Sequence, residues 1–138
     1  MNYFVTGATG FIGKRLVAKL LGRPGATVYF LTRAVELPRL QELYDYWGCR
    51  EDRVIPIVGD LTQPRLGVAN ADIDRLKGKI DHFFHLAAIY DLKASAEDQQ
   101  RANVDGTRNT VRLAEEIGTR HFHLVSSIAA AGLFEGLF

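Results

Sequence analysis

Residues 1–13 read MNYFVTGATGFIG, so a short apolar run leads directly into three evenly spaced glycines, Gly7, Gly10 and Gly13. The run from Asn2 to Thr6 is rich in aromatic and β-branched residues and predicts a strand that Gly7 ends. From Phe11 the apolar residues recur at helical spacing, and Gly22 ends the predicted helix. Glycine weakens strands and helices because it has the most backbone freedom to lose on folding. Three glycines at this junction indicate that something must approach the backbone closely.

The same alternation of strand and helix continues along the chain. Further strands are predicted over Ala26–Thr32, Arg53–Leu61, Asp81–Ala88 and His121–Ser127, and further helices over Pro38–Trp47 and from about Ser95 to Gly118. Pro56 places the third strand at a sheet edge, where a missing N–H is tolerated. The residues expected to face the core are Ile12, Leu16, Val17, Leu20 and Leu21 in the first helix, and Val104, Val111, Ala114 and Ile117 in the last.

This order of elements predicts one α/β domain over residues 1–138. Strands that alternate with helices pair in parallel through right-handed crossovers, with helices on both faces of the sheet. The expected architecture is a Rossmann-type, doubly wound sheet with strand order 3-2-1-4-5. In such sheets ligands bind at the carboxyl ends of the strands, beside the point where the strand order reverses. The stretch TGATGFIG lies at one of those ends.

A strand, a glycine turn and a helix in succession are typical of a phosphate site. The first glycine allows the tight turn, the second lets a pyrophosphate approach the backbone, and the third lets helix and strand pack closely. The N-terminus of the helix adds free N–H groups and a partial positive charge. The spacing here is G-x-x-G-x-x-G, one residue longer in its first gap than the commonest dinucleotide fingerprint. The alternative is a simple strand-to-helix turn.

Composition and charge narrow the class of protein. The chain has 138 residues, 47% hydrophobic and 24% charged, which are ordinary values for a globular protein. Its 17 basic and 16 acidic residues give no electrostatic reason to expect nucleic acid or an anionic membrane as partner. One cysteine, Cys49, allows no internal disulfide and fits a reducing compartment. No apolar run approaches the length of a membrane span, so we expect a cytoplasmic protein.

Five short motifs occur in a fixed order along the chain. They are TGATGFIG (Thr6–Gly13), GDL (Gly59–Leu61), HLAA (His85–Ala88), NVDGT (Asn103–Thr107) and VSS (Val125–Ser127). Together they resemble the extended short-chain dehydrogenase/reductases, and the resemblance covers the whole chain. The long segment between the second and third strands, with GDLTQPRLGV after it, is most similar to the fatty-acyl and thioester reductase branch.

The resemblance implies a set of cofactor-binding residues. The glycine turn would contribute Gly7, Thr9, Gly10, Phe11, Ile12 and Gly13, and the fourth strand would contribute Leu86, Ala87 and Ala88. Asp60 would accept a hydrogen bond from the adenine amino group, with Leu61 against the ring. A turn aspartate that caps the next segment is the alternative for Asp60.

Arg33 bears on which dinucleotide binds. An NAD site usually has a carboxylate at the end of the second strand, where it bonds the ribose diol. Here that strand ends with Thr32 and Arg33, and an arginine fork matches a phosphate. The sequence therefore favours NADP over NAD. Glu36, three residues further on, is the residue that could take the diol instead, and Arg39 is either an assistant or a solvated helix charge.

The resemblance also implies catalytic residues. Ser127, with Ser126 as the alternative, would polarise a carbonyl, and Asn103 would brace the active-site loops. The family's tyrosine and the lysine four residues after it have no match here, because all five tyrosines precede Ser127. The chain ends in AAAGLFEGLF, where the family's active-site loop begins. We therefore expect an amino-terminal portion, without the sixth strand and the substrate-binding part, that is inactive alone.

The leading interpretation is an NADP(H)-dependent oxidoreductase that reduces a fatty-acyl thioester or a related small carbonyl compound. The alternatives are an NAD-dependent nucleotide-sugar epimerase or dehydratase and a non-catalytic dinucleotide sensor, and a homo-oligomer is left open. His82, His85, His121 and His123 have different strand contexts and no nearby cysteine or carboxylate cluster, so no metal site is expected.

Overall fold

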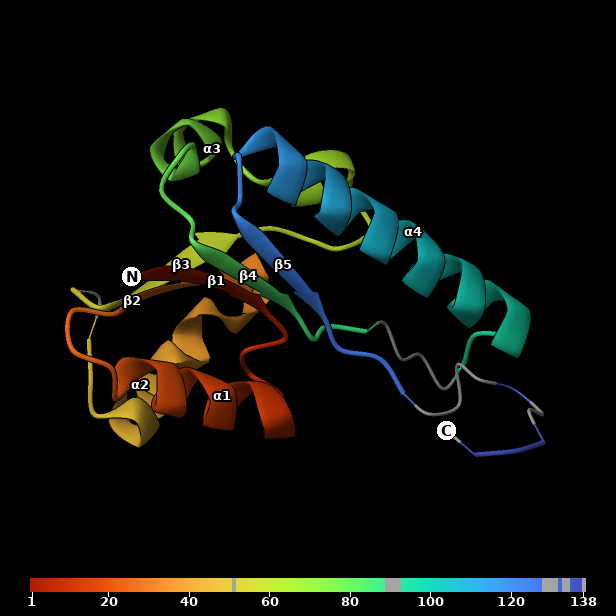
Figure 1. Cartoon of the computed structure of the whole chain (residues 1–138), viewed down its shortest axis with the longest axis horizontal. Helices are drawn as coiled ribbons and strands as arrows, with labels where there is room; N and C mark the ends of the chain where they lie inside the picture. Colours follow the sequence, from red (N-terminus) through yellow and green to blue (C-terminus); the bar gives the residue numbers. More distant parts are fainter. Residues whose placement is uncertain (51, 89–92, 128–131, 133–134, 138) are drawn as a thin grey trace.

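A computed structural model describes residues 1–50, 52–88, 93–127, 132 and 135–137. In this part of the chain five parallel strands form one sheet (Figure 1). The strands are β1 (Asn2–Thr6), β2 (Thr27–Thr32), β3 (Val54–Val58), β4 (His82–His85) and β5 (His121–Leu124). Their spatial order is β3-β2-β1-β4-β5, which confirms the predicted doubly wound α/β fold.

Helices cover both faces of the sheet, as the alternating pattern predicts. Figure 1 shows α1 (Phe11–Leu21) and α2 (Leu40–Trp47) on one face and α3 (Asn70–Leu76) and α4 (Ala96–Glu116) on the other. Two short 3-10 segments, η1 (Ala34–Arg39) and η2 (Pro64–Gly67), follow β2 and β3. The sequence pattern did not predict α3, since seven residues are too few for a clear helical period.

Side chains of β1 alternate between two hydrophobic cores. Val5 faces α1 and α2, where Val17, Phe30 and Trp47 are buried with it. Phe4 faces the other way, and its ring stacks on Phe83 with 4.6 Å between centroids. A strand buried on both faces reads as a continuous apolar run, which is why NYFVT and TVYFLT show little alternation.

The strands end together at the edge of the sheet where the glycine turn begins. Thr6 pairs with His85, and Thr32 pairs with Val58. β1 has its predicted bounds, and the other four strands are shorter than predicted. Gly59–Leu61, Leu86–Ala88 and Val125–Ser127 therefore continue beyond β3, β4 and β5 without regular structure. Pro56 lies in β3, an edge strand, as predicted.

Two residues expected in the core are exposed instead. Val104 is 50% exposed and Ile12 is 63% exposed. The buried face of α4 is formed by Gly106, Thr110, Leu113 and Ala114. Val104 precedes Gly106 by two residues, about 200° around a helix, so it points away from that face. Ile12 is in the first turn of α1, beyond the part that packs on the sheet.

Candidate functional site

A pocket of about 540 Å³ opens at the carboxyl ends of the central strands. The predicted site residues that line it are Gly7, Thr9, Gly10, Arg33, Asp60, Leu61, Leu86, Ala87 and Ala88. They come from four separate stretches of sequence that the strand order brings together. Leu31, Thr32, Glu36, Gly59 and Thr62 also line the pocket, and of these the sequence indicated only Glu36 as a candidate binding residue.

A second, larger hollow of about 840 Å³ lies beside the end of α2, between Gln41 and Arg53. It contains none of the predicted site residues. The Arg53 guanidinium there donates hydrogen bonds to the carbonyl oxygens of Leu21, at 2.7 Å, and Ala26, at 3.2 Å. Arg53 therefore ties the loop before β3 to the loop after α1, which is a structural role.

The glycine turn is shaped by two close backbone approaches. Gly7 has φ +76°, and a Cβ there would lie 2.8 Å from the backbone nitrogen of Ala87. A Cβ at Gly13 would collide with the carbonyl oxygen of Gly7. The first and third glycines therefore let the turn pack against the segment that follows β4 and against α1. Gly10 is the N-cap of α1 and has no side chain to bond the first-turn N–H groups, which suits them to an anion.

A hydrogen-bonded chain supports the floor of the pocket. The Thr6 hydroxyl lies 2.6 Å from Nδ1 of His85, and Nε2 of His85 lies 3.3 Å from the Thr107 hydroxyl. The Ala87 N–H donates to Thr6 Oγ1 at 3.2 Å. Either neutral tautomer completes the chain, because each ring nitrogen faces a hydroxyl group that can donate or accept. Burial lowers the pKa of His85 to about 4, which keeps the ring neutral at pH 7.

Asp60 is held rigidly at the start of the loop after β3. Its Oδ1 accepts hydrogen bonds from the backbone N–H and from the hydroxyl of Thr62, both at 2.8 Å. These bonds lower the pKa of Asp60, so its carboxylate stays ionised. The turn that they form is the capping role that was the alternative for Asp60. The same carboxylate lines the pocket, and its role toward an adenine stays a prediction.

Arg33 and Glu36 form an ion pair at the rim of the pocket. Nη2 of Arg33 lies 2.6 Å from Oε1 of Glu36, and the hydrogen bond raises the pKa of the guanidinium. The side chains are 64% and 28% exposed respectively. The negative charge of Asp60 also acts on Arg33. This end of the pocket therefore carries one positive and two negative charges.

The loop after Asp60 contains an unusual turn that the sequence did not predict. Arg65, Leu66 and Gly67 have φ values of 54°, 54° and 58°, three consecutive residues in the left-handed region. A left-handed conformation costs a non-glycine residue roughly 1–2 kcal/mol, so surrounding contacts must hold it. Leu66 is fully buried in the core between the sheet and α4. RLG resembles ordinary loop sequence, and only the glycine hints at a positive φ.

Other predicted site residues lie outside the lining of the pocket. Phe11 and Ile12 are exposed on the first turn of α1, and Gly13 is buried behind the glycine turn. Asn103 lies on α4, one turn before Thr107, and Ser127 follows β5. The catalytic roles expected of Asn103 and Ser127 stay predictions. Most of the terminal stretch AAAGLFEGLF, namely residues 129–131, 133–134 and 138, is outside the described residues.

Three histidines stack at the outer edge of the sheet. His82 lies 4.8 Å from His121 and 5.2 Å from His123 between ring centroids, and its pKa is lowered mainly by burial. Within the described ranges, no three histidine, cysteine or carboxylate side chains are grouped to hold a metal ion. In the same residues, no helix has the length and apolar character needed to cross a bilayer.

Comparisons with known proteins agree with this geometry. A family model of NAD-binding domains, described as male sterility protein, matches residues 5–136. A linear gramicidin synthase chain of Brevibacillus parabrevis is 36% identical over 96% of this chain, and fatty acyl-CoA reductase 1 of Xenopus laevis is 36% identical over 84%. The matched region corresponds to 3% of the synthase chain and 25% of the reductase.

A solved structure with the same fold is the terminal R domain from the myxalamid PKS-NRPS biosynthetic pathway. It superposes with a TM-score of 0.79 and is 30% identical over 99% of this chain. The match covers 37% of the R-domain chain. The chain thus spans well under half the length of each of these relatives.

Proposed function

The chain belongs to the male sterility protein family within the extended short-chain dehydrogenase/reductases, and we propose that it is the cofactor-binding portion of an NADP(H)-dependent thioester reductase. The observation that carries the proposal is the shared pocket in which the glycine turn, Asp60, Arg33 and Leu86–Ala88 meet. The name of the Xenopus laevis relative, a fatty acyl-CoA reductase, points to fatty-acyl thioesters as the substrate class.

The proposed binding mode follows from the chemistry of the lining. The pyrophosphate would lie over Gly7 and Gly10, against the open N-terminus of α1. The adenine would lie beside Leu61, with its amino group donating to the ionised Asp60. The close approach of Gly7 to Ala87 leaves a floor without side chains between them, which suits an extended dinucleotide.

Arg33 supports NADP as the cofactor. Its guanidinium is at the rim of the pocket and can form a charge-assisted bond to a 2′-phosphate. Glu36 now holds that guanidinium, so the phosphate would have to displace a carboxylate. Glu36 could itself accept hydrogen bonds from the ribose diol of NAD. Equal or tighter binding of NADH would therefore reverse the assignment of NADP as the cofactor.

The proposed reaction divides the work between this chain and residues that it does not contain. When bound, the cofactor would supply a hydride for the carbonyl carbon of the substrate. Ser127 would polarise the carbonyl oxygen, and Asn103 would brace the loops around it. A proton donor is also needed, and the family's tyrosine and lysine have no counterpart after Ser127 in these 138 residues.

A titration tests the cofactor proposal directly. We expect the 138-residue chain to bind NADPH in isothermal calorimetry and Gly10→Leu to abolish binding, because the side chain would occupy the place of the pyrophosphate. Gly22→Leu is a matched control, since Gly22 is at the other end of α1 with φ −67°, against −73° at Gly10. A Cβ would lie 3.3 Å from a carbonyl oxygen at either position.

Retained binding by Gly10→Leu, or equal loss in Gly22→Leu, would refute the pyrophosphate position. Failure of the unmodified chain to bind any nicotinamide dinucleotide would refute the proposed function.

A further inference from the structure

We propose that Arg65 is a positioning residue of the nucleotide site, which holds the loop with Asp60 and Leu61 in its binding conformation by tying it to α4. The inference rests on the proposed function and deepens it. Arg65 is distant in sequence from the glycine turn and does not line the pocket. Its effect on a nucleotide would pass through the loop between residues 59 and 67.

The loop is closed by its own backbone. The Asp60 N–H donates to the Leu66 carbonyl oxygen at 2.7 Å, Gln63 N–H to the Asp60 oxygen at 3.1 Å, and Leu66 N–H to the Gln63 oxygen at 3.0 Å. A Cβ at Gly59 would collide with the Leu66 oxygen, so the returning chain crosses directly over the end of β3. The position of the Asp60 backbone therefore depends on where Leu66 directs its carbonyl group.

The left-handed turn sets that direction. Leu66 has φ 54° and ψ 24°, and its carbonyl oxygen faces Asp60 while its side chain is fully buried. Without a restraint, Arg65 and Leu66 would relax toward right-handed or extended conformations, which L-residues prefer. Such a relaxation would turn the carbonyl group away from Asp60. A contact that holds Arg65 in place is therefore a contact that holds Asp60.

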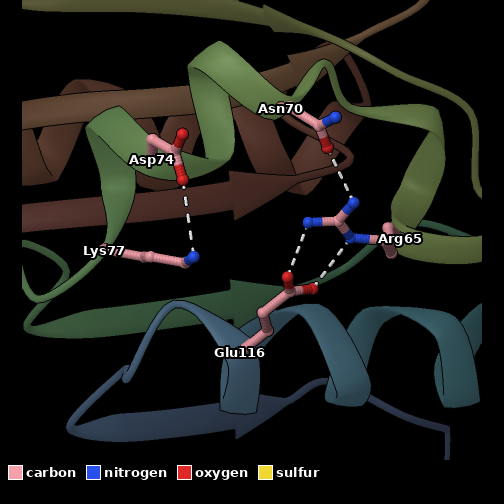
Figure 2. A network of polar contacts seen from close by, with 5 residues as sticks. All are labelled: Arg65, Asn70, Asp74, Lys77 and Glu116. Carbon is pink, nitrogen blue, oxygen red and sulfur yellow. Dashed lines mark hydrogen bonds and ion pairs between the residues drawn. The ribbon is translucent and has the colours of Figure 1, made fainter.

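Arg65 makes that contact with three directed hydrogen bonds (Figure 2). Its Nε and Nη2 donate to the two carboxylate oxygens of Glu116 at 3.0 and 2.6 Å, and Nη1 donates to Oδ1 of Asn70 at 2.7 Å. A bidentate arginine–carboxylate pair fixes orientation as well as distance, which a lysine could not do. The turn is thereby tied to the end of α4 and to the start of α3.

Helix α4 holds the same loop at a second point, nearer the pocket. Nδ2 of Asn109 donates to the carbonyl oxygen of Leu61 at 3.1 Å. Asn109 and Glu116 are seven residues apart, two turns along one face of the helix. One face of α4 thus restrains both ends of the loop, so Asp60 and Leu61 are arranged before a nucleotide arrives. Preorganised loops bind more tightly because less ordering is needed on binding.

The experiment measures NADPH affinity by calorimetry in Arg65→Gln and Glu116→Gln variants of the 138-residue chain. We expect each to weaken binding by roughly two- to fivefold, the upper part of the range for an exposed ion pair. Arg75→Gln is the matched control, since Arg75 also pairs with a carboxylate and is equally exposed, at 46% against 45% for Arg65. Thermal melts confirm that each variant is folded.

A double-mutant cycle separates positioning from general destabilisation. If Arg65 acts through Asp60, then Arg65→Gln should cost little further affinity in an Asp60→Asn background, whose adenine contact is already weakened. The NADPH affinity of Arg65→Lys should fall between those of the wild type and Arg65→Gln. Unchanged affinity in Arg65→Gln and Glu116→Gln, with the wild type binding, would overturn this inference alone. An equal loss in both backgrounds would also overturn it, and absence of binding by the wild type would overturn the proposed function as well.

Discussion

The balance of charge among Arg33, Glu36 and Asp60 decides how this pocket treats a phosphate. Arg33 is the one cation among the described residues that line it, and it is already paired with Glu36. A 2′-phosphate would be attracted by the Arg33 guanidinium and repelled by the carboxylates of Glu36 and Asp60. A ribose diol could donate hydrogen bonds to both carboxylates without breaking the Arg33–Glu36 ion pair. Preference for NADP therefore depends on how readily the phosphate separates Arg33 from Glu36.

Substitutions at the two paired residues should have opposite effects on NADPH affinity. Arg33→Ala removes a charge-assisted contact and should cost roughly 1.5–3 kcal/mol of NADPH binding. Glu36→Gln frees the guanidinium and should strengthen NADPH binding by about 0.5–1 kcal/mol, the value of the exposed ion pair that no longer competes. Glu36→Gln should not strengthen NADH binding, because it removes a carboxylate that could accept bonds from the ribose diol. Calorimetric titration with both cofactors gives the ratio of NADPH affinity to NADH affinity directly.

Arg39→Ala is the control for this pair, because Arg39 is a nearby cation on the same 3-10 segment and does not line the pocket. It should leave the ratio unchanged. Weaker NADPH binding in Glu36→Gln would show that Glu36 orients Arg33 for the phosphate instead of competing with it.

Hydrogen bonds between secondary-structure elements support the pocket from below. His85 ends β4, Thr6 ends β1, and Thr107 lies on α4, so the hydrogen-bonded chain through these three joins two strands to a helix. The same set of hydrogen bonds also holds Ala87, which faces Gly7 across the floor of the pocket. Burial disfavours the protonated imidazole, so the neutral ring makes these hydrogen bonds.

Stability should fall on acidification because of His85. Its pKa is about 4 in the folded chain and 6.5 for an ordinary histidine, so the unfolded chain binds the proton first. The free energy of unfolding should therefore decrease between about pH 6.5 and pH 4, by up to about 3 kcal/mol from this residue. His85→Gln should show a smaller decrease in chemical denaturation series over that range.

His82 must be separated from this effect, since its pKa is lowered too, by burial and by the neighbouring His121 and His123. His82→Gln reports how much His82 contributes to the decrease in the free energy of unfolding with falling pH. A slope that His85→Gln leaves unaltered, and that His82→Gln removes, would place the acid sensitivity at the edge of the sheet.

The whole molecule is a cofactor-binding sheet whose last strand is at an edge. Side chains of β5 are largely exposed, with Leu124 55% exposed. The predicted catalytic Ser127 follows this strand. In our proposal, catalysis requires further residues to complete the surroundings of Ser127, whereas cofactor binding does not.

Activity should accordingly differ between this chain and a longer one. The 138 residues should bind NADPH and fail to reduce long-chain acyl thioesters, because a proton donor typically contributes 10²–10⁴-fold and substrate orientation is missing as well. A longer chain that continues into a tyrosine-x-x-x-lysine sequence should oxidise NADPH with these substrates. Absorbance at the nicotinamide band follows the reaction, and Ser127→Ala in the longer chain should slow it.

Turnover by residues 1–138 alone would mean that another group donates the proton. Binding without turnover in the longer chain would favour the non-catalytic dinucleotide sensor.

Local sequence patterns determined the sheet, its strand order and the glycine turn. Apolar runs, glycine positions and the alternation of elements are short-range features, and the rules for parallel crossovers convert them into one topology. The same rules bring Gly10, Asp60 and Ala87 to one edge of the sheet, which is why most of the pocket could be predicted. Even the Arg33–Glu36 pair is local, because its members are three residues apart.

Contacts between distant segments were decided by the tertiary structure alone. Thr6 and His85 are 79 residues apart, and Arg65 and Glu116 are 51 apart. Neither pair leaves a periodic signal. The first depends on the register of β1 against β4, and the second on how α4 and the loop after β3 pack on the finished sheet. The left-handed turn at Arg65 and Leu66 contradicts local preference and persists because packing around Leu66 and the bond to Glu116 hold it. The exposure of Val104 has a related cause, since periodicity predicts a helical face but not which face the sheet will bury.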